Sequence, residues 1–338
     1  MRTTLAFVRA SQCLSPKVNR SKNFFDRYGF CVFRGVLPKD LCEATIDDMW
    51  KLVIENNAGV DREQVDTWYR GWSSFGMPKN TPSHAIFRAS FLRLRQHPSV
   101  VQCFASMLKT NDIVCNHDRC LMHRPTQDGG VTRKYWATRP NVHLDMNPAE
   151  FLGSEHEKEV GQRLSSLRYS QRKNRAFISE NNDVHSGLGK VLQGMLNFRD
   201  LPSTVDGGGT IVIPGSHNSL LRWWKGNKDT IKQRRGPTQH VLGADMLDFA
   251  QRVCMRAGSL LIWDQRLTHG STSNNSTEFR YGIPIRFCPT DQLLQHRARA
   301  TDRSHVLQEI IVEEGFEDEL SDLGRKVFGL VAQNKQIK

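Results

Sequence analysis

The stretch His143-Leu144-Asp145 places a histidine and an aspartate two residues apart. A second histidine follows at His269, and an arginine lies eleven residues beyond it at Arg280. Two histidines and one carboxylate can occupy one face of an octahedral iron(II) ion and leave the opposite face open. A nearby buried arginine can bind a carboxylate through two parallel hydrogen bonds. Together these side chains predict an iron(II) site next to a site for an oxo-acid.

The residues around these side chains have the patterns of β-strands. Residues 141–143 read as the end of a strand, and Pro148 interrupts the chain soon afterwards. The apolar run 258–264 ends shortly before His269, and a second run, 279–287, carries Arg280 near its start. A lone histidine is more often an ordinary core or surface residue, and the chain holds 12 of them. The metal prediction therefore depends on the whole set.

Four stretches of the chain resemble the phytanoyl-CoA dioxygenase family of iron(II)- and 2-oxoglutarate-dependent oxygenases. The first is similar to the family's opening helix and strand, and the second to its iron-binding pair. The third is similar to its glycine turn, strand and Pro-Gly-Ser-His corner, and the fourth to its distal histidine and oxo-acid anchor. In chain order the four stretches are residues 25–37, residues 143–145, residues 206–217, and residues 269–271 followed by 279–280.

The resemblance implies a mainly β fold with supporting helices. The expected architecture is a double-stranded β-helix, a jelly-roll or cupin-like barrel of two antiparallel sheets. In the family, the matching residues bind iron(II), so the resemblance assigns His143, Asp145 and His269 as the metal ligands. It also implies 2-oxoglutarate as co-substrate, with O2 as oxidant and ascorbate as an optional reductant.

Four further residues are expected to contact the co-substrate. By the resemblance, Arg280 and Ser271 hold the far carboxylate of 2-oxoglutarate. Arg124 matches a basic residue that helps to hold the oxo-acid, but the family has lysine where this chain has arginine. Gln193 lies in the strand-like run 191–198 and is a candidate to face the cavity. An outward position or a local hydrogen bond is the alternative for Gln193.

The resemblance implies oxidation of an unactivated C–H bond in a small-molecule or acyl substrate, with release of succinate and CO2. Hydroxylation, desaturation and cyclisation are the outcomes considered. Halogenation is disfavoured, because halogenating relatives have a small residue where this chain has Asp145. Two other classes remain open, namely an oxygenase that modifies nucleic acid or protein, and a catalytically silent binding protein.

Composition limits the kinds of partner. The chain of 338 residues has 38% apolar residues and no apolar run of about twenty, so no membrane span is expected. Its formal charge of +12 could attract nucleic acid, an anionic membrane or an acidic substrate, or could simply belong to a solvated surface. No nucleic-acid-binding motif is found. The eight cysteines are too sparse for a disulfide scaffold, which favours an intracellular protein.

We divide the chain into three parts. Residues 1–22 form a basic leader, either disordered or a mitochondrial targeting peptide, and a cytoplasmic location is the main expectation. Residues 23–290 form the dioxygenase domain, with a polar insertion at about 150–186 that is either a lid or a passive loop. Residues 291–338 form a helical extension whose last helix, about 318–331, makes an internal contact or a homodimer contact.

Two local patterns complete the predictions. Residues 40–43 resemble a capping box that opens a helix reaching to about Glu55. Residues 112–125 alternate like one strand and contain potential zinc-ligand types at Cys115, His117, Cys120 and His123. A single strand would point Cys120 away from the other three, so no zinc site is expected there.

Overall fold

The computed structural model describes most of the chain, and the statements below concern these residues. They are 18–73, 76–138, 141–145, 148, 162–163, 165–170, 175–183, 191–201, 207–228, 239–240, 248–291 and 297–330. Of the helices within these ranges, none has the length and apolar character that a membrane crossing requires.

The larger of two main sheets has six antiparallel strands. Five of them follow the order β1-β11-β7-β13-β2, and β3 also pairs with β13. Their bounds are β1 (Phe30–Phe33), β2 (Ile113–Asn116), β3 (Leu121–His123), β7 (Leu192–Asn197), β11 (Ser259–Asp264) and β13 (Arg280–Pro289).

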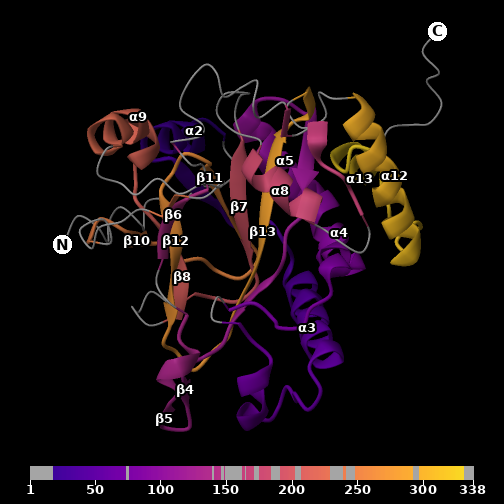
Figure 1. Cartoon of the computed structure of the whole chain (residues 1–338). Helices are drawn as coiled ribbons and strands as arrows, with labels where there is room; N and C mark the ends of the chain where they lie inside the picture. The colour runs from indigo at the N-terminus through magenta and orange to yellow at the C-terminus, as the bar shows by residue number, and fades with distance from the viewer. Residues whose placement is uncertain are drawn as a thin grey trace.

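The smaller main sheet has five strands in the order β10-β8-β12-β6-β9. It lies beside the larger sheet at the centre of the molecule (Figure 1). Its strands are β6 (Asn141–Leu144), β8 (Gly207–Val212), β9 (Gln239–His240), β10 (Gln251–Arg252) and β12 (His269–Asn274). A separate two-stranded ribbon joins β4 (Gln127–Asp128) to β5 (Val131–Thr132). The predicted mainly β class with antiparallel sheets is confirmed.

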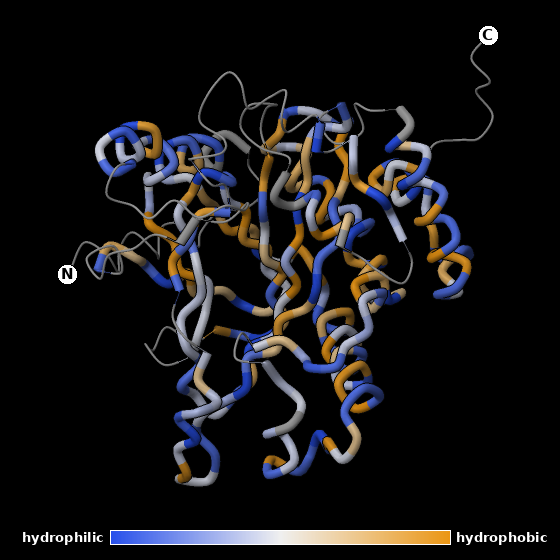
Figure 2. The backbone as a smooth tube through the Cα atoms, in the orientation of Figure 1, coloured by the Kyte–Doolittle hydropathy of each residue, from blue (hydrophilic) through white to orange (hydrophobic). Residues whose placement is uncertain are grey.

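Alternation along the strands of the larger sheet supplies two apolar layers. In β11, Leu261 and Trp263 pack in one cluster with Val212 of the smaller sheet. Leu260 and Ile262 point the other way and join the cluster that the helices share. A strand that is buried on both faces has a continuous run of apolar residues, which is why the sequence of residues 258–264 indicates a strand. Figure 2 shows apolar residues concentrated in the central strands and neighbouring helices.

Helices cover the face of the larger sheet that points away from the smaller one. Figure 1 shows α3, α4, α12 and α13 together on that side, with α2 and α9 at the other end of the molecule. The helices are α2 (Val18–Tyr28), α3 (Lys39–Asn56), α4 (Ala89–Gln96), α5 (Pro98–Leu108), α8 (Arg175–Asp183), α9 (Ser216–Asn227), α12 (Arg297–Glu313) and α13 (Asp322–Val327). Three short 3-10 helices are η1 (Val65–Arg70), η2 (Ser83–Phe87) and η3 (Lys134–Trp136).

Three local predictions need correction. The helix expected from residue 40 exists as α3, but its N-cap is Pro38 and no side chain caps it, so the capping box is wrong. The strand expected over 112–125 is broken into β2 and β3, because residues 117–120 leave the sheet. The final helix expected over 318–331 is only α13, and the longer α12 precedes it.

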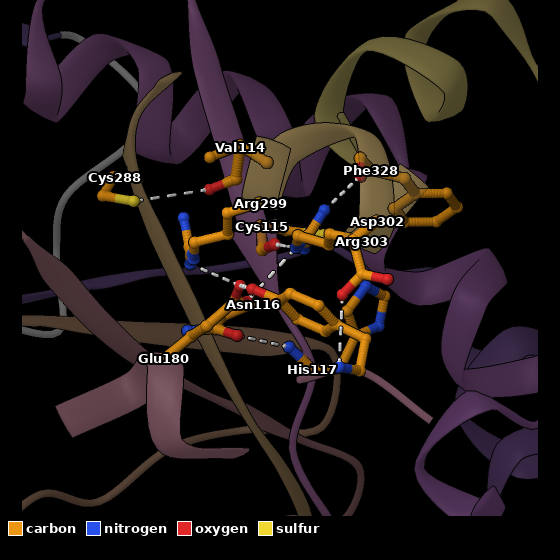
Figure 3. A network of polar contacts seen from close by, with 11 residues as sticks. Val114, Cys115, Asn116, His117, Glu180, Cys288, Arg299, Asp302, Arg303 and Phe328 are labelled. Carbon is orange, nitrogen blue, oxygen red and sulfur yellow. Dashed lines mark hydrogen bonds and ion pairs between the residues drawn. The ribbon is translucent and has the colours of Figure 1, made fainter. Parts of the chain in front are cut away.

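The part of the insertion that the structure describes is joined to the C-terminal extension through Glu180 of α8. This carboxylate is fully buried, and it pairs with Arg299 at 2.5 Å and Arg303 at 3.2 Å, both on α12 (Figure 3). Tyr169 donates a further hydrogen bond to Glu180. Ala176, Phe177 and Glu180 of this helix therefore belong to the packed core. For the rest of 150–186, the lid and passive-loop alternatives concern mainly residues outside the described ranges. Residues 1–17 of the predicted leader also lie outside these ranges.

Candidate metal centre and its cavity

Two neighbouring strands of the smaller sheet bring the predicted ligands together. β6 and β12 pair so that His143 lies directly opposite His269, and Asp145 follows the end of β6. The pairing is close, because a Cβ atom on Gly270 would lie 1.7 Å from the carbonyl oxygen of Asn141. Glycine after His269 is thus required for this register.

The three side chains form a compact group of potential ligand atoms. His143 Nε2 lies 3.3 Å from Asp145 Oδ1, and His269 Nε2 lies 3.6 Å from Asp145 Oδ2. All three ligand atoms lie within 4.8 Å of one another, which fits a single metal ion. Among the residues that the structure describes, this is the one such group of His, Cys, Asp and Glu side chains.

Neighbouring groups fix the orientation of the ligand atoms. His269 Nδ1 lies 2.9 Å from the carbonyl oxygen of Leu267, so a proton on Nδ1 leaves the Nε2 lone pair facing Asp145. Gln193 donates a hydrogen bond from its amide nitrogen to Asp145 Oδ2. Trp263 Nε1 in turn donates to the Gln193 amide oxygen at 2.9 Å. The structure therefore brings Gln193 to the metal group.

The electrostatics favour the protonation states that a metal needs. Burial alone would raise the pKa of Asp145, but its contacts with His143 and His269 outweigh burial and hold this pKa well below the usual value. Burial, followed by the charge of His143, lowers the pKa of His269. At neutral pH the group thus offers a carboxylate and a neutral imidazole, the forms that bind divalent metals.

The metal group opens into a cavity of about 310 Å³ between the two sheets. This volume is at the lower end of the range for small-molecule sites. Both sheets and α8 contribute to its wall, which includes Asn141, Ile178, Met195, Thr210 and Ser271.

Arg280 lies directly behind the cavity wall. It is 2% exposed, and its guanidinium donates to Thr210 Oγ1 at 3.0 Å and to Ser271 Oγ at 3.5 Å. Burial, with a smaller effect from Arg252, lowers its pKa to about 10. Among the described residues, no carboxylate forms an ion pair with it. A buried guanidinium without a counter-charge favours an anionic ligand at this end of the cavity.

Arg124 is not brought to the cavity. Its guanidinium lies 4.7 Å from the ring centre of Trp136 and 5.4 Å from that of Trp72. It donates to the carbonyl oxygen of Trp68 at 2.8 Å and is not part of the cavity wall. Its position is that of a cation held among aromatic rings.

Two residues of the site were missed in the sequence. Arg286 lines the cavity and lies 3.3 Å from Asp145 Oδ2 through its Nη2 atom. Period-two alternation along the strand places it on the same face as Arg280, six residues earlier, so the signal was present. Thr210, the second partner of Arg280, was also missed, although it lies in the quoted stretch 206–217.

Fold and site define a class of protein, an antiparallel β-barrel with two histidines and one carboxylate grouped as a candidate metal centre. The sequence model of "Phytanoyl-CoA dioxygenase (PhyH)" matches residues 184–282. A Dictyostelium discoideum protein named "Putative phytanoyl-CoA dioxygenase" is 33% identical over 307 residues, which cover 88% of this chain and 82% of the relative. The chain belongs to the phytanoyl-CoA dioxygenase family, as the resemblance predicted, and so is an iron(II)- and 2-oxoglutarate-dependent dioxygenase.

A solved structure of similar fold is the epimerase SnoN, in a complex with Fe3+, alpha ketoglutarate and nogalamycin RO. It is 15% identical, with a TM-score of 0.50, and the alignment covers 81% of this chain and 84% of SnoN. At this identity the likeness concerns the fold, and it agrees with the predicted jelly-roll architecture.

Proposed function

We propose that this protein hydroxylates an unactivated C–H bond of a small-molecule or acyl substrate, using 2-oxoglutarate and O2 and releasing succinate and CO2. One observation carries the proposal. A candidate iron group and a buried arginine without a counter-charge lie at the same cavity, so one dicarboxylate could reach both. Desaturation or cyclisation of the substrate is the alternative outcome.

In this proposal His143, Asp145 and His269 hold iron(II), which when bound supplies the activation of dioxygen. The hydrogen bond from His269 to Leu267 keeps one imidazole nitrogen free for the metal. Gln193 and Trp263 hold the carboxylate in place. Such supporting contacts typically change metal affinity by about 10- to 100-fold.

We assign the distal carboxylate of 2-oxoglutarate to Arg280, assisted by the hydroxyl groups of Thr210 and Ser271. Both hydroxyls lie at the cavity wall and contact the guanidinium. Enclosure between the sheets keeps bulk water away from this carboxylate, which strengthens its attraction to the guanidinium. Asp145 fills the carboxylate ligand position, which leaves no ligand place for a halide and favours hydroxylation over halogenation.

The test is substrate-stimulated succinate formation by the purified chain with iron(II), 2-oxoglutarate, O2 and ascorbate, screened against pools of metabolites. His143→Ala, Asp145→Ala and His269→Ala should each reduce turnover to background while the melting temperature stays close to that of the wild type. His305→Ala is a matched control, since this histidine side chain is 67% exposed on α12 and should be silent. Near-normal turnover in any ligand variant would refute the metal assignment. Absence of iron-dependent succinate from the intact chain would instead favour a binding protein.

A further inference from the structure

Arg286 is a second buried arginine on the inner face of β13. It pairs in register with Gln193 of β7 on one side and with Asn116 of β2 on the other, inside the larger sheet. Only 5% of the residue is exposed, yet it forms part of the cavity wall. It shares this face of the strand with Arg280, but it lies beside Asp145 rather than beside Thr210 and Ser271.

The hydrogen-bonding capacity of Arg286 is largely unused. Its Nη2 atom has one contact, with Asp145 Oδ2 at 3.3 Å. Its Nη1 atom is buried and has no hydrogen-bond partner among the described residues. An arginine and a carboxylate that form a bidentate ion pair usually share two parallel hydrogen bonds of about 2.7–2.9 Å. Asp145 Oδ2 also accepts from Gln193, so this long single contact does not account for the position of Arg286.

The charges around the cavity do not balance without another anion. If iron(II) and doubly charged 2-oxoglutarate bind, their charges cancel. The charge of Asp145 cancels that of one arginine, either Arg280 or Arg286, and the other is left over. Two further charged residues of the wall, Asp118 and Arg119, pair with each other at 2.9 Å, and Asp118 also attracts Arg286, but the two charges of this pair cancel and leave the excess unchanged. A buried excess charge is unfavourable unless a ligand neutralises it.

We propose that Arg286 binds an acidic group of the primary substrate, so that the substrate is an organic anion such as a carboxylic acid. The inference rests on the proposed function above and narrows its substrate class. Arg286 would hold the acidic group next to the metal centre, while apolar wall residues such as Ile178 and Met195 would contact the remainder of the substrate. The same guanidinium could instead bind the metal-proximal carboxylate of 2-oxoglutarate, so the test must separate the two sources of carboxylate.

The experiment uses the full chain loaded with Mn(II) and 2-oxoglutarate, which cannot turn over. Acetate and acetamide serve as probes of the same size that differ in charge, and butanoate and butanamide form a longer pair. Mn(II) accelerates the relaxation of ligand methyl protons held near it, so NMR titration reports binding beside the metal. We expect each acid to bind about 10- to 100-fold more tightly than its amide, because a charge-assisted hydrogen bond is lost in the amide.

Arg286→Gln should reduce this preference to about 3-fold or less, and Arg286→Lys should keep part of it, since ammonium retains the charge but not the two-pronged geometry. The affinity for 2-oxoglutarate should change less than about 3-fold in both variants. Arg93→Gln is the matched control, because the Arg93 side chain is 37% exposed, pairs with Glu319 and does not line the cavity; it should preserve the preference.

Each other outcome overturns the inference. Equal binding of acid and amide by the wild type, or no binding of either acid, would exclude an anion subsite. An unchanged preference in Arg286→Gln would place the subsite elsewhere. A large loss of 2-oxoglutarate affinity in Arg286→Gln would assign the arginine to the co-substrate. Failure of the wild type to bind Mn(II) and 2-oxoglutarate would refute the proposed function itself, which is a separate result.

Discussion

Within the described part of the chain, two buried clusters of charged side chains can be compared, and the difference between them distinguishes a cluster that stabilises the fold from one that borders a ligand cavity. The first surrounds Glu180 between α8 and α12 (Figure 3). Both of its carboxylate oxygens have partners, with Oε1 accepting from Tyr169 and Arg299 and Oε2 from Arg303. The second cluster surrounds Asp145, and it adjoins a cavity.

The arginines of the two clusters show the contrast most clearly. Arg303 uses all three of its nitrogens, donating to Glu180, to the carbonyl oxygen of Phe328 and to that of Cys115. Arg286 has one long contact and one nitrogen without a partner, beside a cavity. Arg299 also has unused nitrogens, but it does not line that cavity. Unused donors next to a cavity therefore mark the cluster that is built for ligands.

The largest expected effect concerns the Glu180 cluster. Glu180→Gln removes the only carboxylate that Arg299 and Arg303 share among their described ion pairs, and it leaves two guanidinium groups buried without a counter-charge. Breaking a buried pair in this way typically costs about 3–5 kcal/mol. The free energy of unfolding, measured by chemical denaturation, should fall by that amount.

The matched control for Glu180 is Glu319→Gln. Glu319 pairs with Arg93 at 2.6 Å, but the two side chains are 43% and 37% exposed. An exposed pair is worth about 0–1 kcal/mol, so this variant should be close to neutral. If Glu180→Gln lowered the free energy of unfolding as little as Glu319→Gln, the Glu180 cluster would contribute little to the stability of the fold.

The next largest effect concerns Arg280. Arg280→Ala would leave the distal carboxylate of 2-oxoglutarate buried without its counter-charge, which costs about 2–5 kcal/mol. The concentration of 2-oxoglutarate required for half-maximal turnover should therefore rise by roughly 30-fold or more. Arg280→Lys should recover only part of the loss, because lysine lacks the two-pronged geometry. Iron binding should be unchanged.

Arg124→Gln tests the other assignment of the distal carboxylate. Because Arg124 lies among Trp68, Trp72 and Trp136 and away from the cavity, this variant should leave the 2-oxoglutarate requirement within about 3-fold of the wild type. Normal binding of 2-oxoglutarate by Arg280→Ala, together with a loss in Arg124→Gln, would exchange the two roles.

The sequence predicted the fold and the ligand set because both depend on local patterns. The buried strand before His269 and the H-x-D pair at the end of β6 are short patterns. The register of β6 and β12 then brings the two ligands together by placing His143 opposite His269. Alternation made Gln193 a candidate to face the cavity, and its contact with Asp145 crosses from one sheet to the other. The metal and co-substrate roles of these residues remain predictions for the experiments above.

What the sequence did not predict depends on distant partners. Glu180 lies in a polar segment interpreted as a lid or loop, and the arginines that bury it lie 119 and 123 residues further along the chain. Arg124 was assigned because Arg124-Pro125 matches a Lys-Pro step of the family, whereas surrounding tryptophans decide where its guanidinium lies. Arg286 is different, since counting by twos from Arg280 would have found it.

A smaller effect should appear at Gln193. Its substitution should change metal affinity, whereas substitution of Glu180 should change the free energy of unfolding. Gln193→Ala removes the amide donor to Asp145 and should weaken iron(II) binding by about 10- to 100-fold. Trp263→Phe removes the hydrogen bond that holds Gln193 and should have a weaker effect. Anaerobic iron titration measures both. Metal affinity equal to that of the wild type in Gln193→Ala would show that Asp145 needs no such support.

The smallest expected effect is a pH dependence from His117, which packs at the edge of the Glu180 cluster against Phe87 and Phe328 at ring-centre distances of 4.9 and 5.6 Å. Burial, and then the charges of Arg95 and Arg303, hold its pKa well below the usual 6.5. The folded protein keeps this imidazole neutral, whereas the unfolded chain takes up a proton below about pH 6.5, so stability falls as the pH drops. The slope is about 1.4 kcal/mol per pH unit between the two pKa values.

Denaturation of His117→Phe at several pH values between 5 and 7 should show a shallower slope than the wild type, by up to that amount. His305→Phe, at an exposed position, should keep the full slope. Identical slopes for His117→Phe and the wild type would mean that the buried imidazole is protonated in the folded state. The core beside the Glu180 cluster would then accommodate an additional positive charge.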